Sequence, residues 1–222
     1  MSLNRPYERI SELPEIIPVF PLEGILLLPG AELPLNIFEP RYLEMVDVAL
    51  GAHRLIGMIQ PTPDPETKGG ATNLESVGCL GRITQISESG DGRYSLTLTG
   101  ISRFRTIQEI NVESPFRQMR VSFAEFASDL AEVDIDAIAV RSELTRMLKM
   151  FEQTRGLKID WRSISDTRDD VVINALAMTM QFAQSEKQAL LEADSIKSRA
   201  DILTAIAEQE MAAQAGATTR LQ

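Results

Sequence analysis

The sequence is poor in the side chains that metal sites, disulfides and most nucleophilic catalysis require. It has one histidine, His53, and one cysteine, Cys79, in 222 residues. These two side chains cannot form a zinc site of nitrogen and sulfur ligands or a disulfide framework. No lysine follows a glycine, so the phosphate-binding P-loop is absent, and there is no G-x-S-x-G elbow. We therefore expect neither a metal nor a cofactor.

An excess of basic residues is also missing. The 22 Lys and Arg are outnumbered by 32 Asp and Glu, which gives a net charge of −10. Residues 1–125 and 126–222 each carry 11 basic and 16 acidic side chains. Neither half has the clustered positive charge from which nonspecific affinity for nucleic acids comes, so we expect no nucleic-acid partner.

Long apolar runs are absent as well. The uninterrupted aliphatic stretches, such as Ile25–Leu28, are far shorter than the roughly 20 residues of a membrane helix. Glu8, Glu12 and Glu15 interrupt the N-terminal segment, which therefore does not read as a signal peptide. These features predict a cytoplasmic protein without a membrane partner.

The first half of the chain has the pattern of short β-strands. Tyr94–Thr99 alternates apolar and polar residues with a period of two, and the Gly90-Asp91-Gly92 turn precedes it. Further strands are predicted at 16–20, 25–28, 77–87 and 117–123. Short strands separated by prolines and glycines are typical of a barrel or sandwich, and not of a parallel sheet with crossover helices.

One helix is expected within this half, between Pro40 and Gly51, with Leu43, Val46 and Leu50 on its buried face. Pro61–Asn73 is polar and rich in proline and glycine, which is typical of a mobile loop.

From about residue 126 the period becomes helical. We expect one buried face formed by Val140, Leu144, Met147, Leu148 and Phe151, and another formed by Val172, Ala175, Leu176, Thr179 and Ala183. Ser185 with Gln188 predicts a capped helix through Leu191, Ser198 with Asp201 predicts a further helix, and residues 212–222 read as a frayed end. The fold class is therefore α+β, with a β-rich domain at 1–125 and an α-helical domain at 126–222.

Few residues remain as catalytic candidates. Ser185/Lys187 and Ser195/Lys197 are the nearest serine–lysine pairs, but no glycine-rich oxyanion loop lies near them in sequence. We interpret His53 as a turn residue, Cys79 as a small core residue and Trp161 as a packing residue. Asp169 and Asp170 suit the first turn of a helix. No enzyme signature results.

The most specific pattern is a proline-rich block from Ile17 to Val46, IPVFPLEGILLLPGAELPLNIFEPRYLEMV. It resembles the start of the N-terminal, substrate-binding domain of Lon protease in the order of four pieces: Pro18–Leu22, Leu28–Gly30, Leu33–Leu35 and Phe38–Tyr42. Val77–Ile86, Leu96–Ile107 and Ser185–Ile206 are similar to later parts of that family. The resemblance covers nearly the whole chain.

The resemblance implies a PUA-like pseudo-barrel followed by a helical bundle. It also implies a role in recognising protein substrates, with unfolded or extended polypeptide segments as partners. In Lon, other domains hydrolyse ATP and peptides; this chain resembles stand-alone proteins without them, so we expect a non-catalytic binding module. Two alternatives are an ATP-independent hydrolase or peptidase and a PUA-like RNA binder.

Five residues within the matching blocks are candidates for ligand binding: Glu39, Arg41, Tyr42, Arg103 and Arg105. Glu39 precedes Pro40 and can alternatively cap the predicted helix. Arg41 and Tyr42 combine a planar cation with an aromatic ring, a pairing common where peptides are recognised. Arg103 and Arg105 are two residues apart in an expected strand, so they share one of its faces.

Overall fold

The computed structural model describes residues 5–62, 73–131 and 137–219, and these form two compact units. The sheet unit contains the described residues up to 131 together with 182–191. The helical unit contains the described residues of 137–181 and 192–219. Sequence analysis divides the chain once, after residue 125. In the structure, residues 126–131 and 182–191 group with the strands instead.

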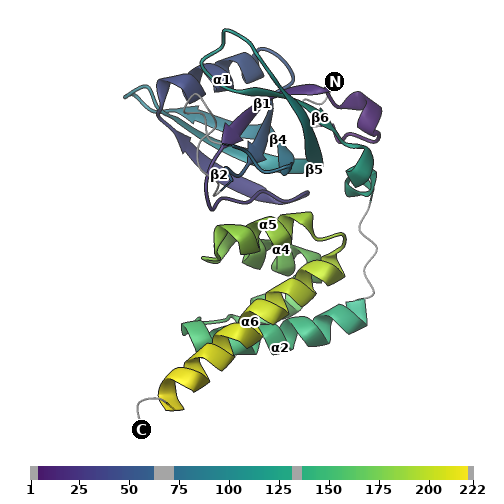
Figure 1. Ribbon diagram of the computed structural model, residues 1–222, viewed down its shortest axis with the longest axis vertical. Helices are drawn as coiled ribbons and strands as arrows, with labels where there is room; N and C mark the ends of the chain where they lie inside the picture. The colour runs from purple at the N-terminus through teal and green to yellow at the C-terminus, as the bar shows by residue number, and fades with distance from the viewer. Residues whose placement is uncertain (1–4, 63–72, 132–136, 220–222) are drawn as a thin grey trace. The chain divides into compact units, whose positions relative to one another are not determined.

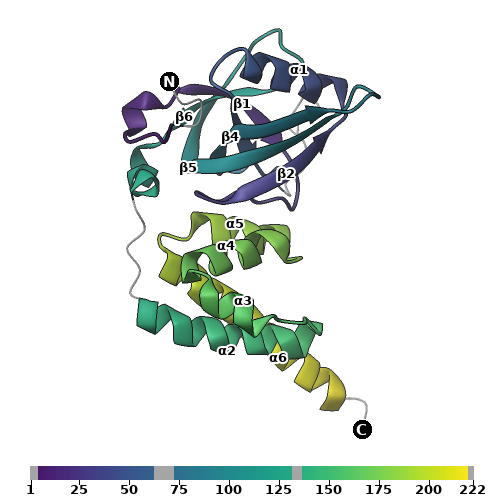
Figure 2. The same ribbon diagram turned by 180° about the vertical axis from the view of Figure 1, so that it is seen from behind.

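Six strands form one mixed sheet, and they curve around a common interior in Figures 1 and 2. The strand order is β2-β5-β4-β3-β1-β6, and β6 also pairs with β5, so five of the strands are joined in a closed ring of pairings. β1 and β3 are parallel, whereas the other pairs are antiparallel. The strands are β1 Ile16–Pro21, β2 Glu32–Ile37, β3 Leu55–Ile59, β4 Val77–Glu88, β5 Tyr94–Ile110 and β6 Gln118–Ser122.

The long strand β5 makes this ring possible. Its first part pairs with β2 and β4, and its last part pairs with β6. The register shifts around Ile101 and Ile107 on β5, and such irregularities bend a strand and increase its twist. The predicted strand at 94–99 is therefore confirmed as the first part of a longer one. Gly92, with φ of +77°, lies in the turn that joins β4 to β5.

The apolar run Ile25–Leu28 is not a strand, which corrects the sequence-based expectation. Leu26, Leu27 and Leu28 are buried, but they belong to an irregular segment that crosses β5 at Gly100. Gly30 N–H donates to Gly100 O (3.0 Å), and Gly100 N–H donates to Ala31 O (2.9 Å). A Cβ at Gly100 would overlap with the carbonyl oxygen of Leu28. The run is buried because it packs on the sheet, not because it joins it.

Helix α1, Pro40–Leu50, forms where it was predicted but turns a different face inward. The buried residues are Tyr42, Met45, Val46 and Ala49, whereas Leu50 is exposed. Gly51 ends the helix with φ of −71°, so it does not use the left-handed conformation that makes glycine common at this position.

The helical unit is built from α2 Ala137–Arg155, α3 Trp161–Asp166, α4 Asp169–Thr179 and α6 Ile196–Thr219. The predicted face of α2 is buried at all five positions from Val140 to Phe151. In α4 the prediction is wrong at Ala175 and Thr179, which are exposed, while Ile173 and Ala177 are buried. The end of α6 is helical through Thr219, which corrects the expectation of a frayed end for residues 212–219.

Helix α5, Gln184–Glu192, belongs to the sheet unit up to Leu191, as do the short 3-10 helices η1, Ile10–Glu12, and η2, Ala124–Leu130. The cap predicted for α5 is wrong, since Glu186 accepts a hydrogen bond from the N–H of Ala183 (2.7 Å). Likewise α6 begins before Ser198, with Ser195 Oγ accepting from Ser198 N–H (3.0 Å). The predicted loop at Pro61–Asn73 lies mostly outside the described residues. Within the described residues, no helix combines the length and the apolar character needed to cross a bilayer.

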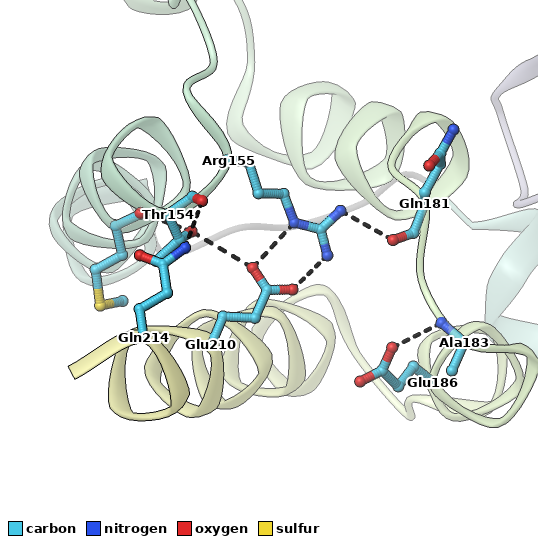
Figure 3. Close-up of polar contacts among 8 residues, drawn as sticks. Thr154, Arg155, Gln181, Ala183, Glu186, Glu210 and Gln214 are labelled. Atoms are coloured by element: carbon cyan, nitrogen blue, oxygen red, sulfur yellow. Dashed lines mark hydrogen bonds and ion pairs between the residues drawn. The ribbon is translucent and has the colours of Figure 1, made fainter. Parts of the chain in front are cut away.

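The guanidinium of Arg155 joins three segments of the helical unit, as Figure 3 shows. Arg155 Nε donates to Glu210 Oε2 of α6 (3.0 Å), its Nη2 donates to Glu210 Oε1, and its Nη1 donates to Gln181 O (2.9 Å). Gln214 Nε2 donates to the Thr154 carbonyl at the end of α2 (2.7 Å). This network fastens the end of α2 to α6.

The crossing at Gly100 predicts a large cost for any side chain there. We expect Gly100→Ala to lower the free energy of unfolding by about 1–3 kcal/mol, because the Leu28 backbone must move to admit the Cβ. Urea unfolding followed by circular dichroism measures it. Gly90→Ala is the control, since nothing lies within 4 Å of a Cβ at that turn position. Equal stability of the two variants would contradict the close approach.

The Arg155–Glu210 pair predicts a pH-dependent stability. Hydrogen bonding from Arg155 lowers the pKa of Glu210 below its ordinary value of 4.5. The pair therefore stabilises the folded state above about pH 4.5, and this contribution is lost as the pH falls through the lowered pKa. We expect Glu210→Gln to cost about 1 kcal/mol at pH 7 and progressively less below pH 4.5.

Thermal unfolding of the wild type and Glu210→Gln between pH 3 and pH 7 measures this difference. Glu208→Gln is the matched control, because its partner Arg146 and Glu208 itself are both more than half exposed. A difference between wild type and Glu210→Gln that stays constant across this range would contradict the assignment.

Candidate functional site

The start of α1 presents an aromatic side chain to solvent. In β2, Leu33, Leu35 and Ile37 pair with the buried side of β5, and Phe38 follows with its side chain 63% exposed. Phe38 directly follows the last residue of β2, and continuing the alternation of the strand would place it on the side opposite the buried Ile37. The sequence analysis missed Phe38, although the alternation that precedes it was a usable signal.

Glu39 is the residue before the first helical turn, but its side chain does not cap the helix. Its carboxylate instead accepts hydrogen bonds from Arg41, whose Nε lies 3.0 Å and whose Nη2 lies 2.9 Å from Glu39 Oε2. Both side chains remain about half exposed. The pair fixes the orientation of the guanidinium at the surface.

Arg41 also rests on a stack of two aromatic rings. Its Cζ lies 4.5 Å from the centroid of the Tyr42 ring, and the ring centroids of Tyr42 and Phe20 are 4.2 Å apart. Burial raises the pKa of the Tyr42 hydroxyl, the nearby Glu39 charge raises it further, and the charges of Arg41 and Arg117 act in the opposite direction. The phenol is therefore neutral at physiological pH. Glu39, Arg41 and Tyr42 thus form one contiguous cluster.

Arg103 and Arg105 both point from β5 toward η2, but they differ in burial. Arg103 and Asp129 have side chains that are 6% and 8% exposed. The Nε and Nη2 of Arg103 donate to Asp129 Oδ2 (2.9 Å) and Oδ1 (2.8 Å), and its Nη1 donates to Leu191 O (3.2 Å). Its guanidinium also lies 4.7 Å from the Phe126 ring centroid. This arginine is held inside the sheet unit.

Arg105 forms a similar but more exposed pair. Its Nε donates to Glu125 Oε2 (2.6 Å) and its Nη2 to Glu125 Oε1 (2.7 Å), with side chains 42% and 53% exposed. The expectation that Arg103 and Arg105 lie on one strand face is consistent with their shared direction toward η2. Their contacts are with acidic residues of η2, whereas Arg41 contacts Glu39 and Tyr42.

A glutamine network attaches α5 to the sheet, and it was not among the predicted features. Gln188 Nε2 donates to the carbonyl of Val77 in β4 (3.1 Å), and Gln60 Nε2 donates to Gln188 Oε1 (3.0 Å). Gln184 Nε2 donates to Pro61 O. These partners are more than 100 residues apart in sequence, so no local pattern could reveal them.

The serine–lysine pairs do not have the geometry of a catalytic dyad. Ser185 and Lys187 are two residues apart on α5, so their side chains diverge by roughly 200° around the helix axis. Ser185 is exposed, while Lys187 is buried and burial lowers its pKa. Ser195 accepts the cap hydrogen bond of α6, and Lys197 pairs with Asp201 at 3.5 Å and Glu143 at 4.0 Å.

The remaining residues that the sequence analysis singled out lie at positions with a structural explanation. His53 is exposed in the turn after α1, Cys79 is a buried thiol in β4, and Trp161 is a half-buried residue at the start of α3. Asp169 and Asp170 lie in the first turn of α4 and pair with Arg141 and Arg168. In the part of the chain that the structure describes, no three His, Cys, Asp or Glu side chains converge as metal ligands.

Comparison with protein families gives one match over most of the chain. The family model of the ATP-dependent protease La (LON) substrate-binding domain matches residues 16–209. Among curated proteins, a Lon protease of Anaeromyxobacter dehalogenans is 25% identical over 190 residues, and Lon protease 2 of Sorangium cellulosum is 27% identical over 221 residues. These alignments cover 85% and 95% of this chain but 22% and 27% of the relatives, so the chain spans about a quarter of their length.

Solved structures agree with this match. A Lon N-terminal domain protein from Xanthomonas campestris is 26% identical, with a TM-score of 0.58, covering 86% of this chain and 97% of that one. The N-terminal domain of the Mycobacterium avium complex Lon protease is 18% identical, with a TM-score of 0.61, and covers 87% and 98%. The second likeness is one of fold.

The contrast between the two arginine pairs on β5 predicts unequal effects on stability. We expect Asp129→Ala to lower the free energy of unfolding by about 3–5 kcal/mol, because it leaves the Arg103 cation buried without its carboxylate. Glu125→Ala removes the partner of Arg105 at the surface and should change stability little. Urea titrations of both variants test this, and equal losses would show that Arg103 is not held by a buried pair.

Proposed function

Because the chain belongs to the family of the ATP-dependent protease La (LON) substrate-binding domain, we propose that it is a non-catalytic module that binds extended segments of other polypeptides. The binding surface in this proposal is the start of α1, formed by Phe38, Glu39 and Arg41, with the buried Tyr42 ring packed against the Arg41 guanidinium. Arg105 lies outside this cluster, and Arg103 serves to hold the sheet unit together.

The observation that carries the proposal is the exposed Phe38 ring three residues before an anchored arginine. Aromatic and arginine side chains are enriched at protein interfaces and dominate their binding energies. Glu39 and the Tyr42 ring already restrict the Arg41 side chain. Less conformational entropy is therefore lost when a ligand binds to it.

Addition of a polypeptide strand to β2 is a less suitable mode of binding than contact with the side chains of the α1 region. β2 lies at the end of the strand order, which makes it an edge strand. Pro34 in its middle has no N–H to donate to an added strand, and proline at this place is a common protection of sheet edges. We therefore assign binding to side chains of the α1 region. The closed ring of strand pairings supports the PUA-like pseudo-barrel as part of this proposal.

The test compares unfolded with folded proteins as ligands. We expect the full chain to bind fluorescein-labelled casein and reduced, alkylated ribonuclease A, but not native ribonuclease A, in fluorescence anisotropy titrations. Phe38→Ala and Arg41→Ala should each weaken binding by about tenfold, which corresponds to about 1.4 kcal/mol.

Ile107→Ala is the matched control, since Ile107 is 61% exposed on β5 of the same unit. Circular dichroism verifies that all variants are folded. Binding to neither unfolded protein would refute the proposal, and so would equal losses in Ile107→Ala and Phe38→Ala. If the wild type cuts these unfolded proteins into peptide fragments and a single Ser→Ala change abolishes the cleavage, the non-catalytic part of the proposal is refuted.

A further inference from the structure

The outer face of α1 is largely exposed, and the hydrogen bond between Asp47 and Tyr94 links it to the sheet. Tyr42, Met45, Val46 and Ala49 cover the inner face, whereas Glu44, Asp47 and Val48 point outward. Figures 1 and 2 both show α1 on the outside of the strands. Val48 is 50% exposed, so this face adds a second apolar side chain to that of Phe38.

The charge on this face is negative. Arg41 is neutralised by Glu39, whose carboxylate lies 2.9 Å away. Within the described residues, no ion pair reaches Glu44 or Asp47. Asp47 accepts a hydrogen bond from the hydroxyl of Tyr94 (2.9 Å), which leaves its charge in place.

A third carboxylate lies beside them. Glu88 is opposite Tyr94 in the β4–β5 pairing, and both Asp47 and Glu88 raise the pKa of the Tyr94 hydroxyl. The two acidic groups therefore act on the same ring. A cationic ligand would meet complementary charge along α1, and an anionic one would be repelled.

The spacing of the apolar residues limits the ligand further. Val48 follows Pro40 by eight residues of α1, which is roughly 12 Å along the helix axis. Phe38 precedes Pro40 by two residues outside the helix, which add up to about 7 Å, so an extended chain spans the separation in about four to six residues. A ligand that contacts both Phe38 and Val48 thus needs two apolar side chains about four to six positions apart, with the acidic residues facing the chain between them.

We propose that the outer face of α1 selects extended segments in which lysine or arginine lies between two apolar residues about four to six positions apart. Phe38 and Val48 contact the apolar side chains, and Glu44 and Asp47 attract the cations. This inference rests on the proposed function and specifies the class of polypeptide that the same surface binds.

Matched synthetic peptides test this selectivity. One peptide carries Leu and Phe four positions apart with two Lys between them, and its counterpart carries two Glu instead. We expect the full chain to bind the Lys peptide at least tenfold more tightly in anisotropy titrations at low salt. Raising the salt from about 50 to about 300 mM should reduce this ratio, because exposed charges are screened.

The double variant Glu44→Gln with Asp47→Asn should reduce the ratio to less than threefold while both peptides still bind. Glu113→Gln with Asp194→Asn removes two exposed carboxylates elsewhere and should leave the ratio unchanged. Circular dichroism verifies the fold of each variant.

The outcomes separate the two proposals. Binding of unfolded proteins without a preference for the Lys peptide, or a preference that survives the double variant, overturns this inference and leaves the proposed function in place. Failure of all peptides and both unfolded proteins to bind overturns the proposed function, and this inference with it.

Discussion

The sheet unit depends on the buried guanidinium of Arg103, which extends from β5 and contacts both η2 and α5. Asp129 supplies its counter-charge, and Leu191 O accepts from its Nη1 at the end of α5. A buried charge is tolerated only when it is paired and hydrogen-bonded, so these partners must be in place together. The requirement gives a physical reason why a helix from late in the chain returns to the strands.

This long-range contact marks the limit of what the sequence predicts about the fold. The strands at 16–20 and 77–87, helix α1 and the inner face of α2 follow from local periodicity and are confirmed. Ile25–Leu28 is buried by packing on Gly100, which composition cannot distinguish from burial within a strand. The assignment of α5 to the sheet unit rests on Gln60, Gln188 and Val77, whose pairing appears only after folding.

The candidate site divides in the same way. Glu39, Arg41 and Tyr42 are neighbours in sequence, so their cluster could be predicted as soon as a helix was expected to begin at Pro40. Phe38 was not predicted as a binding residue, although the alternation that ends in Ile37 places the next residue on the opposite side of the strand. For Arg103, the decisive fact is its partner Asp129, 26 residues away, and no spacing rule connects them.

The two proposals assign recognition to one restrained side chain, that of Arg41, and to a neighbouring surface of apolar and acidic side chains. The Arg41–Tyr42–Phe20 stack holds one cation in a fixed position, while Phe38, Val48 and the carboxylates of Glu44 and Asp47 offer contacts that many sequences can satisfy. Few of these contacts are directional hydrogen bonds, so the affinity for any one segment should be modest and many different segments should bind. That combination suits the proposed binding of many different unfolded segments, because specificity for one sequence would require contacts that exclude the others.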